Sequence, residues 1–133
     1  MTCVQLRNYQ HMQRFFLLTL LVLFFSACQE FDSTKIIEPT DFQIEAVSLN
    51  LSEGVLATNV AAQKVEEDTQ FTIVGATLRH EGKETVGIWL FDEQNPSSIK
   101  SVNEAALAFS PFPEQHQLKV TSEARNLSAF LQR

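Results

Sequence analysis

The chain has 133 residues, of which 44% are hydrophobic and 20% are charged, and its formal net charge is −6. All 16 acidic residues follow position 28, whereas only eight of the ten basic residues do, so the part beyond that position has a formal charge of about −8. Such a balance repels phosphate backbones and anionic headgroups, which argues against nucleic-acid binding and against membrane attachment by charge.

The first predicted element is an apolar run at residues 15–25, which is interrupted only by Thr19 and preceded by Arg14. A basic residue before a short apolar run matches the start of a secretory signal peptide. Eleven helical residues span about 16 Å, roughly half of a bilayer core, so the run is too short for a comfortable transmembrane helix. Met12 would begin a compact leader, and we favour it over Met1 as the start of translation.

The run ends in Phe25-Ser26-Ala27-Cys28, which resembles the lipobox of bacterial lipoproteins, although that family more often has an aliphatic residue where this chain has Phe25. The resemblance implies that residues 1–27 are a signal peptide removed before Cys28. It also implies that the Cys28 thiol carries a diacylglycerol and that the freed amine is acylated. The alternative is an ordinary signal peptide with a cysteine at the junction by chance. Cys28 would then be the sole, unpaired cysteine of an exported protein.

The same resemblance predicts where the protein resides. Two or three acyl chains give stable anchoring, so the expected partner is a bacterial envelope membrane, reached through the lipid on Cys28. Gln29 is not the aspartate that retains some lipoproteins in the inner membrane, which favours the outer membrane. Glu30 and Asp32 resemble a surface-export signal of some lipoproteins.

Residues 28–39 are predicted to be the lipidated cysteine and a flexible tether, because the segment is polar, aperiodic and ended by a proline. Residues 40–133 would then form a single domain. No disulfide is available to it, so packing alone has to stabilise the fold.

The first part of this domain has two predicted elements. Residues 42–51 alternate in two opposite phases, which favours a bulged strand, while Thr40 and Gln43 form a capping-box pattern that would instead begin a helix. After them, Ser52 is a candidate N-cap and apolar residues lead a stripe of three-and-four spacing. We therefore expect a helix over about residues 53–66.

A β-hairpin is the clearest element, with strands at residues 71–79 and 83–91 that are rich in β-branched and aromatic side chains. We expect a three-residue loop, 80–82, because Gly82 can adopt positive φ at its third position. A two-residue loop would place Glu81 at positive φ and is rejected for that reason. The resulting register pairs Thr77 with Thr85, Gly75 with Gly87, Ile73 with Trp89, and Phe71 with Phe91.

This register suggests a candidate site. Gly75 facing Gly87 would leave a shallow trough with Trp89 as its wall, a possible ligand or partner groove. The alternative, which we favour, is that a helix backbone packs closely against the two glycines.

The C-terminal third is predicted to contain a helix capped by Ser98, a short strand at residues 117–121 and a closing helix from Ser122. Two apolar stripes support these helices. They consist of Ile99, Val102, Ala106 and Phe109 in the first helix and Ala124, Leu127, Phe130 and Leu131 in the second.

Catalytic motifs are mostly absent. The chain has no HExxH pair, no cysteine cluster for zinc and no glycine-rich phosphate loop, so no cofactor or metal is expected. A hydrolase site could still be assembled from His80, His116 and Asp92.

The sequence therefore predicts an α+β fold in which a small antiparallel sheet, centred on the hairpin of residues 71–91, packs against two or three helices. The leading function is a lipid-anchored, non-enzymatic binding or accessory module for an envelope protein or small ligand. The alternatives are a membrane-tethered hydrolase, which needs its three residues to converge, and a carrier of small apolar molecules, which needs a cavity between hairpin and helices.

Overall fold

The computed structural model describes residues 30–133. The predicted signal peptide and the predicted lipidation site, Cys28, lie outside the described residues. Within the described part, Phe31–Arg133 forms one compact unit with its own hydrophobic core.

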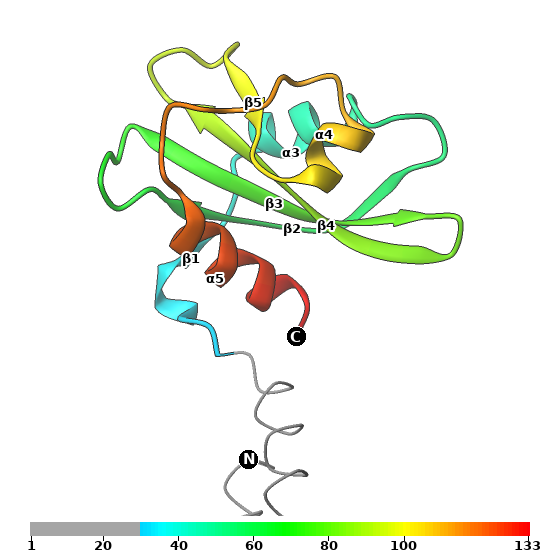
Figure 1. Ribbon diagram of the computed structural model, residues 1–133, viewed down its shortest axis with the longest axis horizontal. Coiled ribbons are helices and arrows are strands. Elements are labelled where there is room, and N and C mark those ends of the chain that lie inside the picture. Colours follow the sequence, from blue (N-terminus) through cyan, green and yellow to red (C-terminus); the bar gives the residue numbers. More distant parts are fainter. Residues whose placement is uncertain (1–29) are drawn as a thin grey trace, which may run out of the picture. The chain divides into compact units, whose positions relative to one another are not determined.

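One five-stranded sheet organises this unit, and its strands are ordered β1-β2-β3-β4-β5 with every neighbouring pair antiparallel (Figure 1). The strands are β1 (Ile36–Ile37), β2 (Leu56–Lys64), β3 (Phe71–His80), β4 (Lys83–Asp92) and β5 (Ile99–Ser101). The described helices are the short 3-10 helix η2 (Ser33–Lys35), α3 (Asp41–Ser48), α4 (Glu104–Phe109) and α5 (Thr121–Leu131). The predicted α+β fold, a small antiparallel sheet with packed helices, is confirmed.

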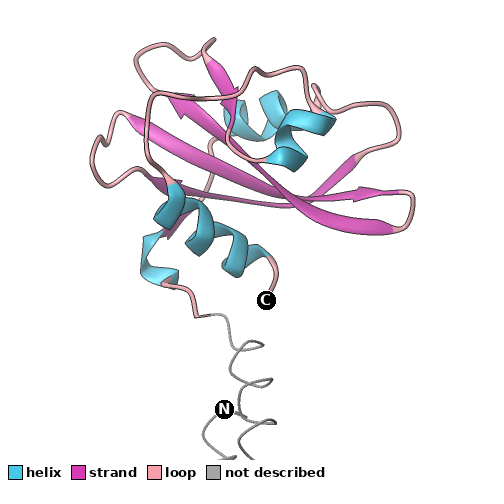
Figure 2. Cartoon of the chain, viewed as in Figure 1, coloured by secondary structure: helices cyan, strands magenta, loops and turns pink. Residues whose placement is uncertain are grey.

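The helices divide between the two faces of the sheet. Helices α3 and α4 lie on one side and α5 lies on the other, so the hairpin is covered on both faces (Figure 2). Because neighbouring residues of a strand point to opposite faces, β3 and β4 supply both cores. Val74, Trp89 and Phe91 pack under α3 and α4, whereas Ile73 and Ile88 pack under α5.

The hairpin exists as predicted, but its loop and register were wrong. The loop has two residues, Glu81 and Gly82, both at positive φ (51° and 76°), as a type I′ turn requires. This shifts the register by one residue and places Arg79 opposite Glu84, to which it donates a hydrogen bond of 2.8 Å. The expected register would have placed Arg79 opposite Lys83. The observed register thus pairs opposite charges at the end of the hairpin and places Glu81 at positive φ.

Residues 42–51 do not form the favoured strand. Most of α3 lies there instead, and the capping box held as the alternative is present. Thr40 Oγ1 accepts from the backbone N–H of Gln43, and Gln43 Oε1 accepts from the N–H of Thr40 at 2.9 Å. The alternation of apolar residues suggested a strand because Phe42, Ile44 and Leu49, which it counted as core residues, are exposed in the helix.

Residues 53–66 do not form the predicted helix, since most of them belong to β2. A register shift between Ala57 and Val60 lets both residues pack against the same core cluster although they are three positions apart. The bulge therefore imitates helical spacing within a strand.

The C-terminal third is partly as predicted. The helix expected from Ser98 is divided into β5 and α4, and Asn103 caps α4 by accepting from the N–H of Ala106 at 3.0 Å. The strand expected at residues 117–121 is irregular chain up to Val120, and Thr121 begins α5. The closing helix is confirmed, with its start within one residue of the prediction and its end at Leu131, and Leu127 and Leu131 are on its buried side.

The predicted tether is wrong from Phe31 onward. Residues 31–37 belong to the domain: Ile36 and Ile37 of β1 pair with β2, and the Phe31 ring contacts Phe130 of α5 edge-on, with 5.5 Å between centroids. The segment is held through the backbone of Asp32, which Asn126 of α5 binds, and through the pairing of Lys35 with Glu66.

Candidate functional site

An apolar cleft of about 490 Å³ lies between α3 and the loop that joins β4 to β5. One wall is a stripe along α3 formed by Phe42, Glu45, Ala46 and Leu49, at the spacing that places side chains on one helix face. The other wall contains Pro96. The volume of the cleft is within the usual range of small-molecule binding sites.

Two large side chains of this cleft are exposed for a physical reason. Phe42 is 51% exposed, and its ring contacts the buried Phe91 in an edge-to-face pair with 6.4 Å between the centroids. Leu49 is 80% exposed because it lies past the last turn of α3, beyond the buried Val47. Contiguous exposed apolar side chains of this kind typically mark a binding surface.

The charges around this cleft have one sign. Between Lys35 and Lys64 the chain has no basic residue, and it has four acidic ones, of which Asp41 and Glu45 are on α3 itself. Lys100 follows the cleft residue Ile99, but it is opposite Leu90 in the sheet and therefore faces the α5 side.

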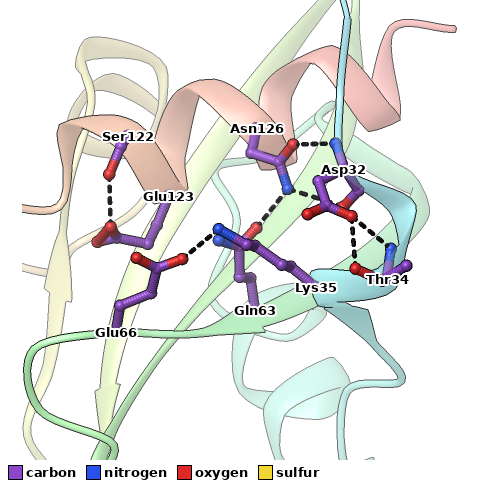
Figure 3. A network of polar contacts seen from close by, with 8 residues as sticks. All are labelled: Asp32, Thr34, Lys35, Gln63, Glu66, Ser122, Glu123 and Asn126. Atoms are coloured by element: carbon purple, nitrogen blue, oxygen red, sulfur yellow. Dashed lines mark hydrogen bonds and ion pairs between the residues drawn. The ribbon is translucent and has the colours of Figure 1, made fainter.

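A polar network on the opposite side of the sheet fastens the start of the domain to α5 (Figure 3). Asn126 Oδ1 accepts from the backbone N–H of Asp32 at 2.6 Å, and its Nδ2 donates to the Asp32 carbonyl at 3.1 Å and to Gln63 Oε1 at 2.8 Å. Lys35 pairs with Glu66, two residues beyond the end of β2. We call the contacts of Asp32, Asn126 and Gln63 the N-terminal clamp.

Two ionisable groups respond to these contacts. The hydroxyl of Thr34, followed by its backbone N–H, lowers the pKa of the Asp32 carboxyl because both donate hydrogen bonds to the charged form. The hydrogen bond to Glu66 raises the pKa of Lys35 for the corresponding reason. Both groups are therefore charged at neutral pH.

Replacing Asn126 with alanine should release the N-terminal segment. The change removes three hydrogen bonds, so we expect the free energy of unfolding to fall by about 1 to 2 kcal/mol, measured by urea denaturation. Limited proteolysis should then cut after Lys35 faster than in the unmodified protein. Ser128→Ala, on the same helix, is the control, and equal cleavage in both variants would contradict the role of the clamp.

The predicted groove of Gly75, Gly87 and Trp89 is not formed. In the observed register Gly75 is opposite Ile88 and Gly87 is opposite Ala76, so the two glycines are on opposite faces of the sheet. Leu127 and Leu131 of α5 cover Gly75, and the indole of Trp89 itself covers Gly87. Trp89 is fully buried, and its N–H donates to Ser110 Oγ at 2.9 Å. Close packing, the favoured alternative, explains both glycines, although side chains rather than a helix backbone fill the space.

The three residues of the hydrolase alternative do not converge. Asp92 is opposite Phe71, nine strand residues and about 30 Å from His80 along β3. The His80 ring packs against Phe109, and His116 is an exposed side chain beside Glu114. They form no joint site.

The remaining predicted features concern metals, membranes and cavities. Within residues 30–133 no group of three His, Cys, Asp or Glu side chains could hold a metal ion, and no helix of that part is long and apolar enough to cross a bilayer. The carrier alternative required a cavity between hairpin and helices. Buried side chains of the two core clusters occupy that space.

Sequence reasoning missed both the cleft and the clamp. The capping box at Thr40 was the available signal for the cleft, because a helix over residues 41–48 places Phe42, Glu45 and Leu49 on one face. No local pattern could indicate the clamp, because Asp32 and Asn126 are 94 positions apart.

Comparison with known protein families, with curated proteins and with solved structures found no match.

Proposed function

We propose that this protein is a lipid-anchored, non-enzymatic binding module of a bacterial cell envelope, more specifically of the outer membrane, which binds its partner through the cleft beside α3. The observation that carries the proposal is the short distance between the predicted anchor and the fold. Phe31 is three residues from Cys28, a reach of at most about 11 Å.

This short link would orient the domain. The clamp holds Asp32 on α5, so the side of the sheet that carries α5 would lie next to the bilayer. Helix α3 packs on the opposite face, which directs the cleft away from the membrane. A binding surface in that position remains accessible to a partner in the surrounding compartment.

The test is the intact mass and membrane fractionation of the full chain and of Cys28→Ser. We expect a mature species that begins at Cys28, carries diacylglyceryl and acyl mass and sediments with the membrane, and we expect the variant to lose that mass and the anchoring. Cys3→Ser is the matched control, because this cysteine precedes the predicted cleavage point and should not affect the mature species. An unlipidated, soluble product of the unmodified chain would contradict the proposal.

A further inference from the structure

We propose that the cleft beside α3 binds an amphipathic helix of another protein, whose apolar side chains enter the cleft and whose Lys or Arg side chains lie against the acidic residues of α3. This inference rests on the proposed binding function and names the partner of that function. It depends on the shape of the cleft, on its charges and on the exclusion of a second copy of this chain.

The shape favours a helix over an extended peptide. The α3 stripe runs from Phe42 to Leu49, seven residues and about 10 Å, which matches apolar side chains over two turns of a facing helix. An extended strand would require unpaired backbone groups. The N–H and C=O groups along α3 are largely used within the helix, and Pro96 on the other wall has no N–H.

The outer edge of β5 is already paired at its Ser101 end. Strand β5 is the last strand of the sheet, but the Ser101 N–H donates to the Pro113 carbonyl at 2.7 Å. The Ser101 carbonyl accepts from the Gln115 N–H at 2.9 Å. An added strand would therefore find no free backbone groups at Ser101, whereas the α3 wall of the cleft offers apolar side chains.

The charges select a basic partner. Asp41 and Glu45 lie on α3, and Glu45 lines the cleft, with no basic residue among the lining side chains. Cationic residues that flank the apolar face of a partner helix would complement these carboxylates, while acidic ones would be repelled.

A second copy of this chain fits the cleft poorly. A symmetric contact between two α3 helices would bring Asp41 and Glu45 of both copies together and repel. Helix α5 carries exposed Arg125, but its apolar residues Leu127 and Leu131 are buried in its own core. The described part of a second copy therefore has no free helix that is both apolar and basic.

The experiment uses two fluorescent 14-residue helical peptides with the same leucine face, one with lysines and one with glutamates on the other face. The full chain is purified as the cell produces it and, if it carries lipid, is placed in phosphatidylcholine nanodiscs. Fluorescence anisotropy at low salt reports binding, with empty nanodiscs subtracted. We expect saturable 1:1 binding of the lysine peptide and at least tenfold weaker binding of the glutamate peptide.

Three variants localise the binding. Leu49→Glu should weaken the binding of the lysine peptide at least tenfold, because it removes the most exposed apolar side chain of the cleft. Glu45→Lys should weaken the binding of the lysine peptide about three- to tenfold and strengthen the binding of the glutamate peptide. Leu56→Glu is the matched control. Leu56 is 65% exposed but lies on the other face of the sheet, so this substitution should change the affinity for the lysine peptide less than twofold.

Equal binding of both peptides, or binding that Leu49→Glu leaves unchanged, would overturn the proposal. A dimer that sediments as such and dissociates in Leu49→Glu would overturn it too, because the occupant would then be a second copy. None of these readings depends on lipid, so the helix-binding inference and the membrane anchor can fail separately.

Discussion

Replacing Trp89 with alanine is expected to lower the free energy of unfolding by about 3 to 5 kcal/mol, a large part of the 5 to 15 kcal/mol typical of small domains. Trp89 is fully buried between the sheet and the layer of α3 and α4. Its removal would leave a cavity and deprive Ser110 Oγ of its indole donor. Urea denaturation followed by circular dichroism measures the change.

A second variant separates packing from hydrogen bonding at this position. Ser110→Ala keeps the indole in place and leaves its N–H unpaired, so we expect a loss of about 1 to 3 kcal/mol, smaller than that of Trp89→Ala. Trp89 is also the only tryptophan, and acrylamide should quench its fluorescence weakly in the folded protein. A loss below about 1 kcal/mol in Trp89→Ala, or strong quenching, would restore the groove interpretation.

Gly75→Val is expected to destabilise the fold by about 1 to 3 kcal/mol through overpacking under α5. A Cβ atom at Gly75 would lie 2.8 Å from Leu131 Cδ1 and 3.0 Å from Leu127 Cδ2, closer than side chains tolerate. The same denaturation experiment measures this loss. Thr85→Val, at an exposed strand position, is the control and should change the stability by less than about 0.5 kcal/mol.

A double-mutant cycle tests the cause of this effect. Leu131→Ala removes the closest atom, so Gly75→Val should cost less in the Leu131→Ala background than in the unmodified protein. Equal costs in both backgrounds would mean that Gly75 does not lie under Leu131, and would contradict the observed packing of α5 on the sheet.

Only part of the candidate site could be anticipated. Its acidic charge is visible in the sequence, because residues 36–63 contain four acidic side chains and no lysine or arginine. The cleft itself depends on whether residues 42–51 form a helix or a strand. The sequence of that segment fits both a strand and a helix. The helix forms, and it buries Gln43 and Val47 against the rest of the domain.

The sequence by itself determined the α+β class, the β-hairpin of residues 71–91 and the closing helix of residues 121–131, because each depends on a local pattern of β-branched or periodic apolar side chains. Tertiary structure alone decided the register of that hairpin, the strand at residues 56–64 and the fastening of residues 31–37 to α5. The physical reason is the separation along the chain of the residues that interact. Cross-strand pairs, the bulge and the Asp32 to Asn126 contacts draw their energy from residues far apart in the chain, and only the folded sheet brings these together.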